Sequence, residues 1–245
     1  MPVSSPAIAK GRKAAGFARR WVGTRLERLI SPRIFDLLGV RRRRFERAAK
    51  LGVWCGSGET VSGDGSSLEA TKVVRAALPL LLTELDIRTL LDVPCGDWNW
   101  MSRVELPVER YIGGDIVTSL VDANQERYGS PDREFRIIDV CIDVLPTADM
   151  LLCRDALIHF SFADVWRALE NIGRTEVQFL ATTTFMATSV NSDQPTGLRW
   201  RHLNLRAPPF NFPEPMHAIV DNFNRDDQRL CVWRVSDVPR PLPRH

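Results

Sequence analysis

Short apolar runs of strand length alternate with stretches of helical spacing between residues 89 and 182, and this alternation constrains the fold more than any other feature. The strand candidates are residues 89–93, 110–113, 135–138, 150–153 and 177–182. Residues 118–128 and 161–172 have the apolar spacing of amphipathic helices. Strands that are joined by helical crossovers lie parallel in one sheet. The sequence therefore predicts an α/β fold with a largely parallel sheet.

The segments on either side of this region have patterns of their own. Before it, residues 66–69 (Ser-Ser-Leu-Glu) match a helix N-terminal cap, so a helix is expected to start there and to run to about residue 81. Pro79 is expected to kink that helix or to divide it in two. After it, residues 216–223 and 229–235 flank the turn sequence Asn-Arg-Asp-Asp, which predicts an antiparallel C-terminal hairpin.

Charge divides the chain at about residue 50. Residues 1–50 hold 14 Lys and Arg against 3 acidic residues, a net charge of +11, whereas residues 51–245 carry −8. Apolar residues recur in the first segment at near-helical spacing, which predicts a basic, partly helical extension (1–50) ahead of one domain (51–245). A solvated extension is the favoured interpretation. The alternative is an arm that binds anionic lipid at the inner face of the membrane, or a phosphate-rich partner.

Cysteine usage and hydropathy indicate the compartment. The five cysteines form an odd set without a Cys-x-x-Cys pair, so neither a disulfide framework nor a thiolate zinc site is expected. No apolar run reaches the roughly 18 to 20 residues needed to cross a bilayer, and the N-terminus lacks the apolar region of a secretory signal. The expected location is the cytoplasm.

Polar side chains end four of the predicted strands. Asp92 ends the first strand and is followed by a turn at Gly96, and Asp115 ends the second strand about twenty residues on. Asp139 follows the third strand, and Cys153-Arg154-Asp155 ends the fourth. The carboxyl ends of parallel strands form the crevice in which open α/β sheets bind ligands, and a carboxylate at the second strand can accept both hydroxyls of a ribose. The pattern predicts a ligand site at this edge, although helix capping is an alternative role for the acids.

These segments resemble the class I S-adenosylmethionine-dependent methyltransferases over roughly residues 68–238. Asp92-x-Pro94-x-Gly96-x-Trp98 is similar to that family's Asp/Glu-x-Gly-x-Gly-x-Gly motif, with Pro94 and Trp98 where glycine is usual. Residues 152–160 resemble its fourth motif. The closest resemblance is to a bacterial subgroup, of unassigned acceptor, with Asp-x-Pro-Cys-Gly-Asp-x-Asn-Trp, Cys-Arg-Asp and Pro-Pro-Phe-Asn-Phe-Pro. The implied fold is a Rossmann-like, seven-stranded, mostly parallel sheet closed by an antiparallel C-terminal hairpin.

The resemblance implies S-adenosylmethionine as the cofactor and no metal. Asp115 is expected at the ribose, Asp139 at the adenine amine and Trp98 over the methionine portion. The complete expected cofactor set is Asp92, Pro94, Gly96, Asp97, Trp98, Asp115, Ile116, Asp139, Val140, Cys153 and Arg154. Asp155 and His159 are the candidate catalytic bases. Asp155 is the stronger candidate, because it lies just beyond the strand that faces the reactive methyl.

The implied reaction is methyl transfer to a small-molecule or saccharide acceptor, with O-methylation favoured. Residues 185–215 are expected to form the acceptor site, because this segment is long, rich in proline and aromatic residues and follows the fifth strand. Within it, Arg199, Trp200, Arg201 and His202 are candidates to hold an anionic or sugar-like acceptor. Packing is the alternative role for its aromatic residues.

Three other functions fit parts of the sequence. A non-catalytic adaptor would keep the fold and use the basic arm. A nucleic-acid methyltransferase would use the arm for phosphates, but the −8 charge of residues 51–245 disfavours it. A nicotinamide-dependent oxidoreductase would share the turn and the following acid, but the chain lacks a full G-x-G-x-x-G.

Overall fold

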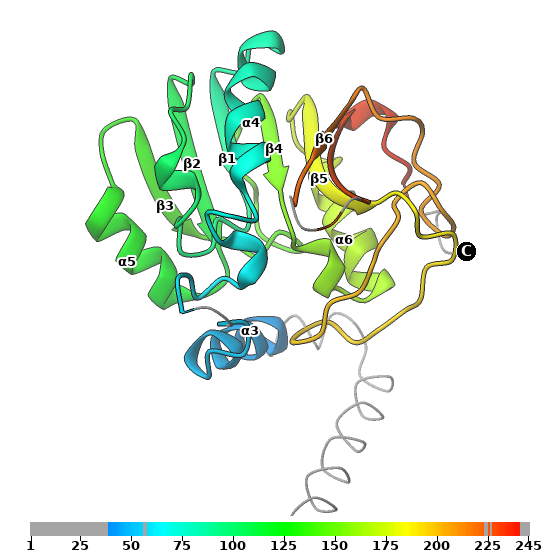
Figure 1. The fold of residues 1–245 in the computed structure, drawn as a ribbon, viewed down its shortest axis with the longest axis horizontal. Helices are drawn as coiled ribbons and strands as arrows, with labels where there is room; N and C mark the ends of the chain where they lie inside the picture. The colour runs from blue at the N-terminus through cyan, green and yellow to red at the C-terminus, as the bar shows by residue number, and fades with distance from the viewer. Residues whose placement is uncertain (1–38, 56–57, 223–224, 226, 241–245) are drawn as a thin grey trace, which may run out of the picture. The chain divides into compact units, whose positions relative to one another are not determined.

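The computed structural model describes residues 39–55, 58–222, 225 and 227–240 (Figure 1). The chain divides into two compact units, Met1–Arg41 and Arg42–His245, and the second contains the sheet. Residues 1–38 of the basic extension predicted over residues 1–50 lie outside the described residues. The basic run that follows it forms helix α3 (Val40–Lys50), whose basic side chains at positions 42, 43, 47 and 50 are exposed. Among the described helices, none combines the length and the apolar character needed to cross a membrane.

A sheet of seven strands in the order β3-β2-β1-β4-β5-β7-β6 forms the centre of the second unit (Figure 1). Five strands run parallel: β1 Thr89–Asp92, β2 Arg110–Asp115, β3 Arg133–Ile137, β4 Met150–Cys153 and β5 Phe179–Phe185. The hairpin of β6 (His217–Val220) and β7 (Gln228–Arg234) pairs antiparallel with β5 through β7. The predicted α/β, Rossmann-like sheet with its antiparallel C-terminal hairpin is therefore confirmed.

Helices cover both faces of the sheet. Successive strand residues point to opposite faces, and both faces carry apolar side chains that pack against helices. On β1, Leu90 belongs to one apolar cluster and its neighbour Leu91 to the other. Helices α4 (Lys72–Glu84) and α5 (Thr118–Tyr128) contribute to the cluster that contains Leu90, and α6 (Phe162–Ile172) contributes to the cluster that contains Leu91. Four short 3-10 helices complete the described elements: η1 Asp64–Ser66, η2 Met101–Arg103, η3 Leu157–His159 and η4 Val235–Asp237.

The helix ends test the capping signals. The Ser161 hydroxyl accepts the amide of Asp164 at 3.2 Å, as its position at the start of α6 predicts. Helix α4, in contrast, begins at Lys72 rather than near residue 67, and it continues through Pro79 without a break, so the expected division is wrong. The physical reason is burial: apolar side chains on both sides of the proline pack into the core, and each contributes roughly 1.5–3 kcal/mol.

Candidate functional site

The acids predicted at the first two strand ends are buried at the carboxyl edge of the sheet. Asp92 is 2% exposed and accepts the hydroxyl of Tyr111 at 2.6 Å. Burial raises the pKa of Asp92 to about 7. Asp115 is 5% exposed and accepts the amides of Gly96 at 3.1 Å and Val117 at 2.9 Å. Burial raises the pKa of Asp115 to about 6 despite these hydrogen bonds, a perturbation typical of functional sites.

The other predicted contacts at this edge differ in accessibility. Asp139, after β3, accepts the amide of Cys141 at 3.0 Å and so caps its own turn. Val140 is buried beside it. Pro94 and Ile116 remain partly accessible. Asp115 and Asp139 therefore accept hydrogen bonds from backbone amides of their own turns, and both lie at the predicted ligand edge.

Gly96 forms the turn that follows β1. Its φ is +58°, a conformation that glycine adopts without strain, and its carbonyl accepts the side-chain amide of Asn124 at 2.8 Å. A Cβ atom at this position would collide with the side chain of Ser62. The sequence predicts that another group lies close to Gly96, and in the structure that group is the Ser62 side chain of the same chain.

Replacing Gly96 with alanine should lower the free energy of unfolding by about 1–2 kcal/mol, the cost of a side chain in the left-handed region. Urea unfolding measures this loss. Gly173→Ala is the matched control, because Gly173 has a φ of −67° and its substitution should change stability by less than about 0.5 kcal/mol. Equal effects of the two substitutions would contradict the assigned turn.

Asp97 holds the glycine- and serine-rich segment that precedes α4. Its carboxylate accepts the Thr60 hydroxyl at 2.7 Å, the Val61 amide at 2.8 Å and the Ser62 hydroxyl at 3.0 Å. The Asp97 amide in turn donates to the Ser62 hydroxyl at 2.8 Å. The carboxylate is thus taken up by the chain's own donors, and its predicted contact with a cofactor has no support in this arrangement.

The contact of Trp98 with a cofactor stays a prediction, and in this structure the side chain packs in the core. Its φ of +57° turns the ring inward, and only 4% of the residue is exposed. The ring packs against Tyr128, with the ring centroids 4.6 Å apart, and against Phe135 at 5.6 Å. Cys153 is also fully buried, and burial raises the pKa of its thiol to about 12. Neither side chain is available to a ligand here.

A charged network lies at the end of β4. The buried Arg154 guanidinium contacts Asp221 at 2.5 Å (Nε to Oδ1) and Asp155 at 3.3 Å (Nη1 to Oδ2). It also donates to the carbonyl of Gly65 at 2.8 Å. The predicted cofactor contact of Arg154 is replaced by these internal partners. Sequence reasoning missed Asp221, whose only signal was an acid within a predicted strand of the hairpin.

Asp155 is held at the same strand end in an uncommon backbone conformation. Its φ is +53°, and its amide donates to the Thr183 hydroxyl at 2.9 Å. Its carboxylate accepts the side-chain amide of Gln228 at 3.0 Å, and its side chain is 22% exposed. Burial raises the pKa of Asp155 to about 6. Strained, non-glycine residues of this kind cluster at functional sites, because the surrounding structure must hold them in place.

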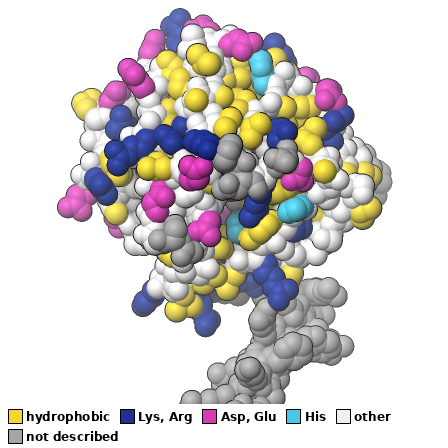
Figure 2. All heavy atoms as spheres, in the orientation of Figure 1, with side chains coloured by type: hydrophobic (Ala, Val, Ile, Leu, Met, Phe, Trp, Pro, Cys, Tyr) yellow, Lys and Arg dark blue, Asp and Glu magenta, His cyan; other side chains and the backbone are white. Residues whose placement is uncertain are grey.

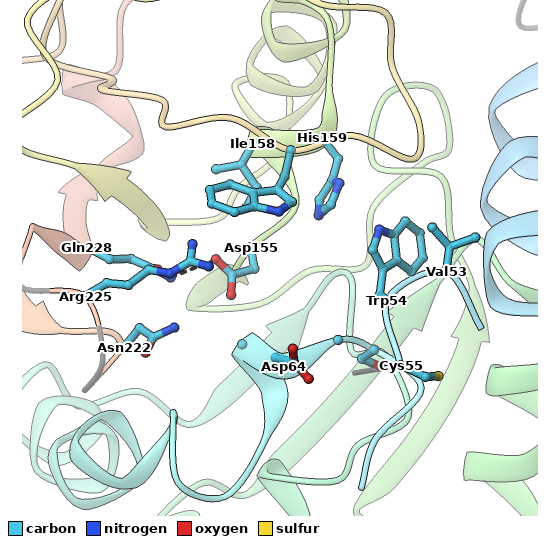
Figure 3. A pocket seen from close by; sticks show the side chains of 14 residues that line it. Val53, Trp54, Cys55, Asp64, Asp155, Ile158, His159, Asn222, Arg225 and Gln228 are labelled. Atoms are coloured by element: carbon cyan, nitrogen blue, oxygen red, sulfur yellow. Dashed lines mark hydrogen bonds between the residues drawn. The ribbon is translucent and has the colours of Figure 1, made fainter. Parts of the chain in front are cut away.

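A cavity of about 330 Å³ opens beside Asp155 (Figure 3). Its polar walls are Asp64, Asp155, Asn222, Arg225 and Gln228, and its aromatic walls are Trp54, His159 and Trp200. In Figure 3 the labelled side chains converge from the segment before α4, the β4–α6 junction and the C-terminal hairpin, and Trp200 comes from the segment between β5 and β6. None of the three acids at the ends of β1, β2 and β3 lines this cavity. The three acids of the predicted cofactor edge therefore lie outside the walls of the cavity that holds the candidate bases, although β1 and β4 are neighbours in the sheet.

His159 faces Asp155 across this cavity (Figure 3). Its Nδ1 lies 3.1 Å from the carbonyl oxygen of Arg199, which accepts only, so the Nδ1 proton is donated there and Nε2 is the nitrogen that can take a proton. Its ring meets Trp54 edge-on at 5.4 Å. Burial lowers the pKa of His159 to about 4, so the ring is neutral at pH 7. Both predicted bases therefore share one cavity.

Of the predicted acceptor contacts, only Trp200 reaches the cavity. The guanidinium of Arg201 is buried and donates to the carbonyl of Phe160 at 2.5 Å, so it holds the β4–α6 junction, and Arg201 does not line the cavity. His202 is stacked on Phe185 with ring centroids 4.3 Å apart. Much of the segment packs into the core through the apolar residues 203, 205, 210 and 212. Most of residues 185–215 therefore serve in packing, which was the alternative role expected from the sequence.

Within the described part of the chain, no group of three or more His, Cys, Asp and Glu side chains is arranged to hold a metal ion. All five cysteines are free thiols.

Comparisons with known proteins give partial likenesses to solved structures. No family model matches the chain, and neither does any curated protein. Human N-acetylserotonin methyltransferase in complex with SAM is 16% identical, with a TM-score of 0.36, over 47% of this chain and 38% of that one. SAM-bound CalS10, an amino pentose methyltransferase from Micromonospora echinaspora, is 16% identical, with a TM-score of 0.39, over 44% of this chain and 48% of that one.

A third solved structure covers more of the chain. The N-terminal domain of EvdMO1, in the presence of SAH and D-fucose, is 18% identical, with a TM-score of 0.47, over 65% of this chain and 82% of that one. The first two likenesses span less than two thirds of the matched chains. All three have less than 25% identity and a TM-score below 0.5, so the function is inferred below from the site itself.

Proposed function

We propose that the chain transfers a methyl group from S-adenosylmethionine to a hydroxyl of a small-molecule or saccharide acceptor. The observation that carries this proposal is the position of Asp155. It lies two residues after the end of β4, with a φ of +53°, on the side of the sheet where the acid-bearing strands end, and it lines the cavity. A carboxylate at that junction can take a proton from an acceptor that is bound beside the cofactor edge.

The residues at the edge suit this cofactor in their chemistry. The carboxylate of Asp115 accepts two amide hydrogen bonds, which leaves lone pairs for the two hydroxyls of a ribose. Asp139 offers the same capacity to an adenine amine. Because Asp115 is only 5% exposed and Ser62 packs at the adjacent turn, binding requires residues 59–66 to shift. When bound, S-adenosylmethionine supplies a methyl group activated by a positively charged sulfonium.

The chain's own residues orient the acceptor and receive its proton. Asp155, with a pKa of about 6, is ionised at pH 7 and accepts the hydroxyl proton. Arg154 and Gln228 fix its two oxygens. Correct placement of two reactants is worth an effective molarity on the order of 10⁵ M or more, so positioning supplies much of the rate.

The cavity walls favour a hydroxylated ring as the acceptor. The aromatic side chains Trp54 and Trp200 offer flat apolar surfaces, while Asp64, Asn222 and Gln228 offer polar groups. Flat apolar surfaces combined with placed polar groups fix the orientation of small ligands. A nucleic-acid acceptor has less support, because acidic and basic side chains are interspersed on the face shown in Figure 2.

Calorimetric titration of the full chain with S-adenosylmethionine tests the proposal, and Asp115→Ala should weaken binding by about 1–3 kcal/mol. Asp122→Ala is the matched control, because Asp122 is exposed on α5 and should not affect affinity. Absence of binding by the natural chain would favour the non-catalytic adaptor. Unchanged binding by a folded Asp115→Ala protein would contradict the assigned cofactor edge.

A further inference from the structure

Arg225, in the connection between β6 and β7, is the one side chain that is cationic at pH 7 among the described residues that line the cavity (Figure 3). Its guanidinium forms no ion pair and no side-chain hydrogen bond with a described residue. Because it has no such partner and none of its nitrogens is fully buried, these nitrogens are open to solvent. The N–H donors of the guanidinium are therefore free to bind a ligand in the cavity.

Stacked rings hold this guanidinium in place without using its N–H groups. Its Cζ lies 4.2 Å from the centroid of the Trp200 ring, which is a cation–π contact. Trp200 stacks in turn on His202, with ring centroids 5.6 Å apart, and His202 stacks on the fully buried Phe185 at 4.3 Å. The stack begins in the core, so Arg225 is preorganised to bind an anionic group in the plane of its guanidinium.

The charges at the cavity favour a carboxylate as that anionic group. Asp155 already has a counterion, because Arg154 lies 3.3 Å from it. In Figure 3 the side chain of Arg225 extends toward Asp155. Asp64 comes from η1 and is exposed, so solvent screens its charge. One guanidinium matches the single charge of a carboxylate, whereas a phosphate monoester carries about −1.5 to −2 at pH 7.

We infer that Arg225 is a specificity-determining residue, which binds a carboxylate of the acceptor and so places a hydroxyl of the same molecule next to Asp155. This inference rests on the proposed function and narrows its substrate class to hydroxylated carboxylic acids, such as a uronic acid. Arg199 and Arg201, the basic residues that the sequence indicated for an anionic acceptor, do not line the cavity. A neutral sugar with the same ring forms no ion pair with Arg225 and should bind more weakly.

The methyl β-glycosides of D-glucuronic and D-galacturonic acid serve as probes, each compared with the methyl β-glycoside of its neutral parent sugar. Ligand-observed NMR on the full chain, without cofactor, measures the four affinities. We expect at least one acid to bind roughly tenfold more tightly than its neutral counterpart. In Arg225→Gln, whose folding circular dichroism checks, that preference should disappear.

Arg199→Gln is the matched control, because it removes the same charge from the residue that precedes Trp200 and that does not line the cavity. It should keep the preference for the acid. The natural chain gives a second measurement that needs no variant. Its preference for the acid should shrink between about 20 mM and about 500 mM NaCl, since salt screens an ion pair that is open to solvent.

Four results would each overturn the role of Arg225. They are equal binding of acids and neutral sugars to the natural chain, absence of binding by both acids, a preference that persists in folded Arg225→Gln, and a preference that salt leaves unchanged. The titration with S-adenosylmethionine is separate, so the cofactor proposal can stand if the role of Arg225 fails.

Discussion

Replacement of Asp221 by alanine is expected to lower the free energy of unfolding by about 3–5 kcal/mol, because it leaves the buried Arg154 guanidinium without its nearest countercharge. Asp221 is fully buried, and Arg154 is 3% exposed at its side chain. Asp155 remains as a second countercharge at 3.3 Å, but the shorter contact with Asp221 at 2.5 Å is lost. Urea unfolding followed by circular dichroism measures the loss.

A surface ion pair provides the matched control. Glu170 and Arg174 also lie 2.5 Å apart, but their side chains are 47% and 69% exposed. Glu170→Ala should therefore change stability by no more than about 0.5 kcal/mol. The double variant Asp221→Leu with Arg154→Met removes both charges and should lose less stability than Asp221→Ala. A loss below about 1 kcal/mol for Asp221→Ala would show that the pair does not hold the hairpin to β4.

Asp155→Asn is expected to reduce kcat by about 10²–10⁴-fold, the contribution of a positioned base. Asparagine keeps the shape of the side chain and can still accept the Gln228 amide, but it takes no proton at neutral pH. The measurement is formation of S-adenosylhomocysteine in the presence of a saccharide acceptor. A residual rate close to that of the natural chain would remove Asp155 from the mechanism.

The pH dependence separates the two candidate bases. A base acts in its ionised form, so kcat/KM should rise with pH through about 6, the pKa of Asp155, and then level off. The same inflection should be absent from Asp155→Asn. His159 has a pKa of about 4, so an inflection there, retained in Asp155→Asn, would assign the proton transfer to His159.

The raised pKa of Asp155 follows from where the fold places it. Burial raises the pKa of Asp155, the positive charge of Arg154 lowers it, and the negative charge of Asp221 raises it. The balance lies near the pH at which a base is most useful. Because the hairpin supplies both Asp221 and Gln228, a change in β6–β7 packing would alter the proton affinity of Asp155 as well as its position.

The sheet and the acids at its strand ends were predictable from the sequence. Alternation of strand and helix lengths reports local periodicity, and periodicity sets which faces are buried, so the five parallel strands and the C-terminal hairpin were predictable. The acids at positions 92, 115 and 139 were predictable as strand-end residues for the same reason. The Ser161 cap depends on contacts within one turn, and it was read correctly.

The contacts of individual side chains, in contrast, depend on the folded chain. Asp97 binds donors more than thirty residues earlier in the chain, and Trp98 turns into the core, because the positive φ at 96 and 98 reorients the turn. Arg154 meets Asp221 across a sequence separation of 67 residues, and Asp155 meets Gln228 across 73. These contacts exist because β7 pairs antiparallel with β5. Local patterns carry no record of such long-range pairing, so the residues that hold the base in place became visible only in the folded chain.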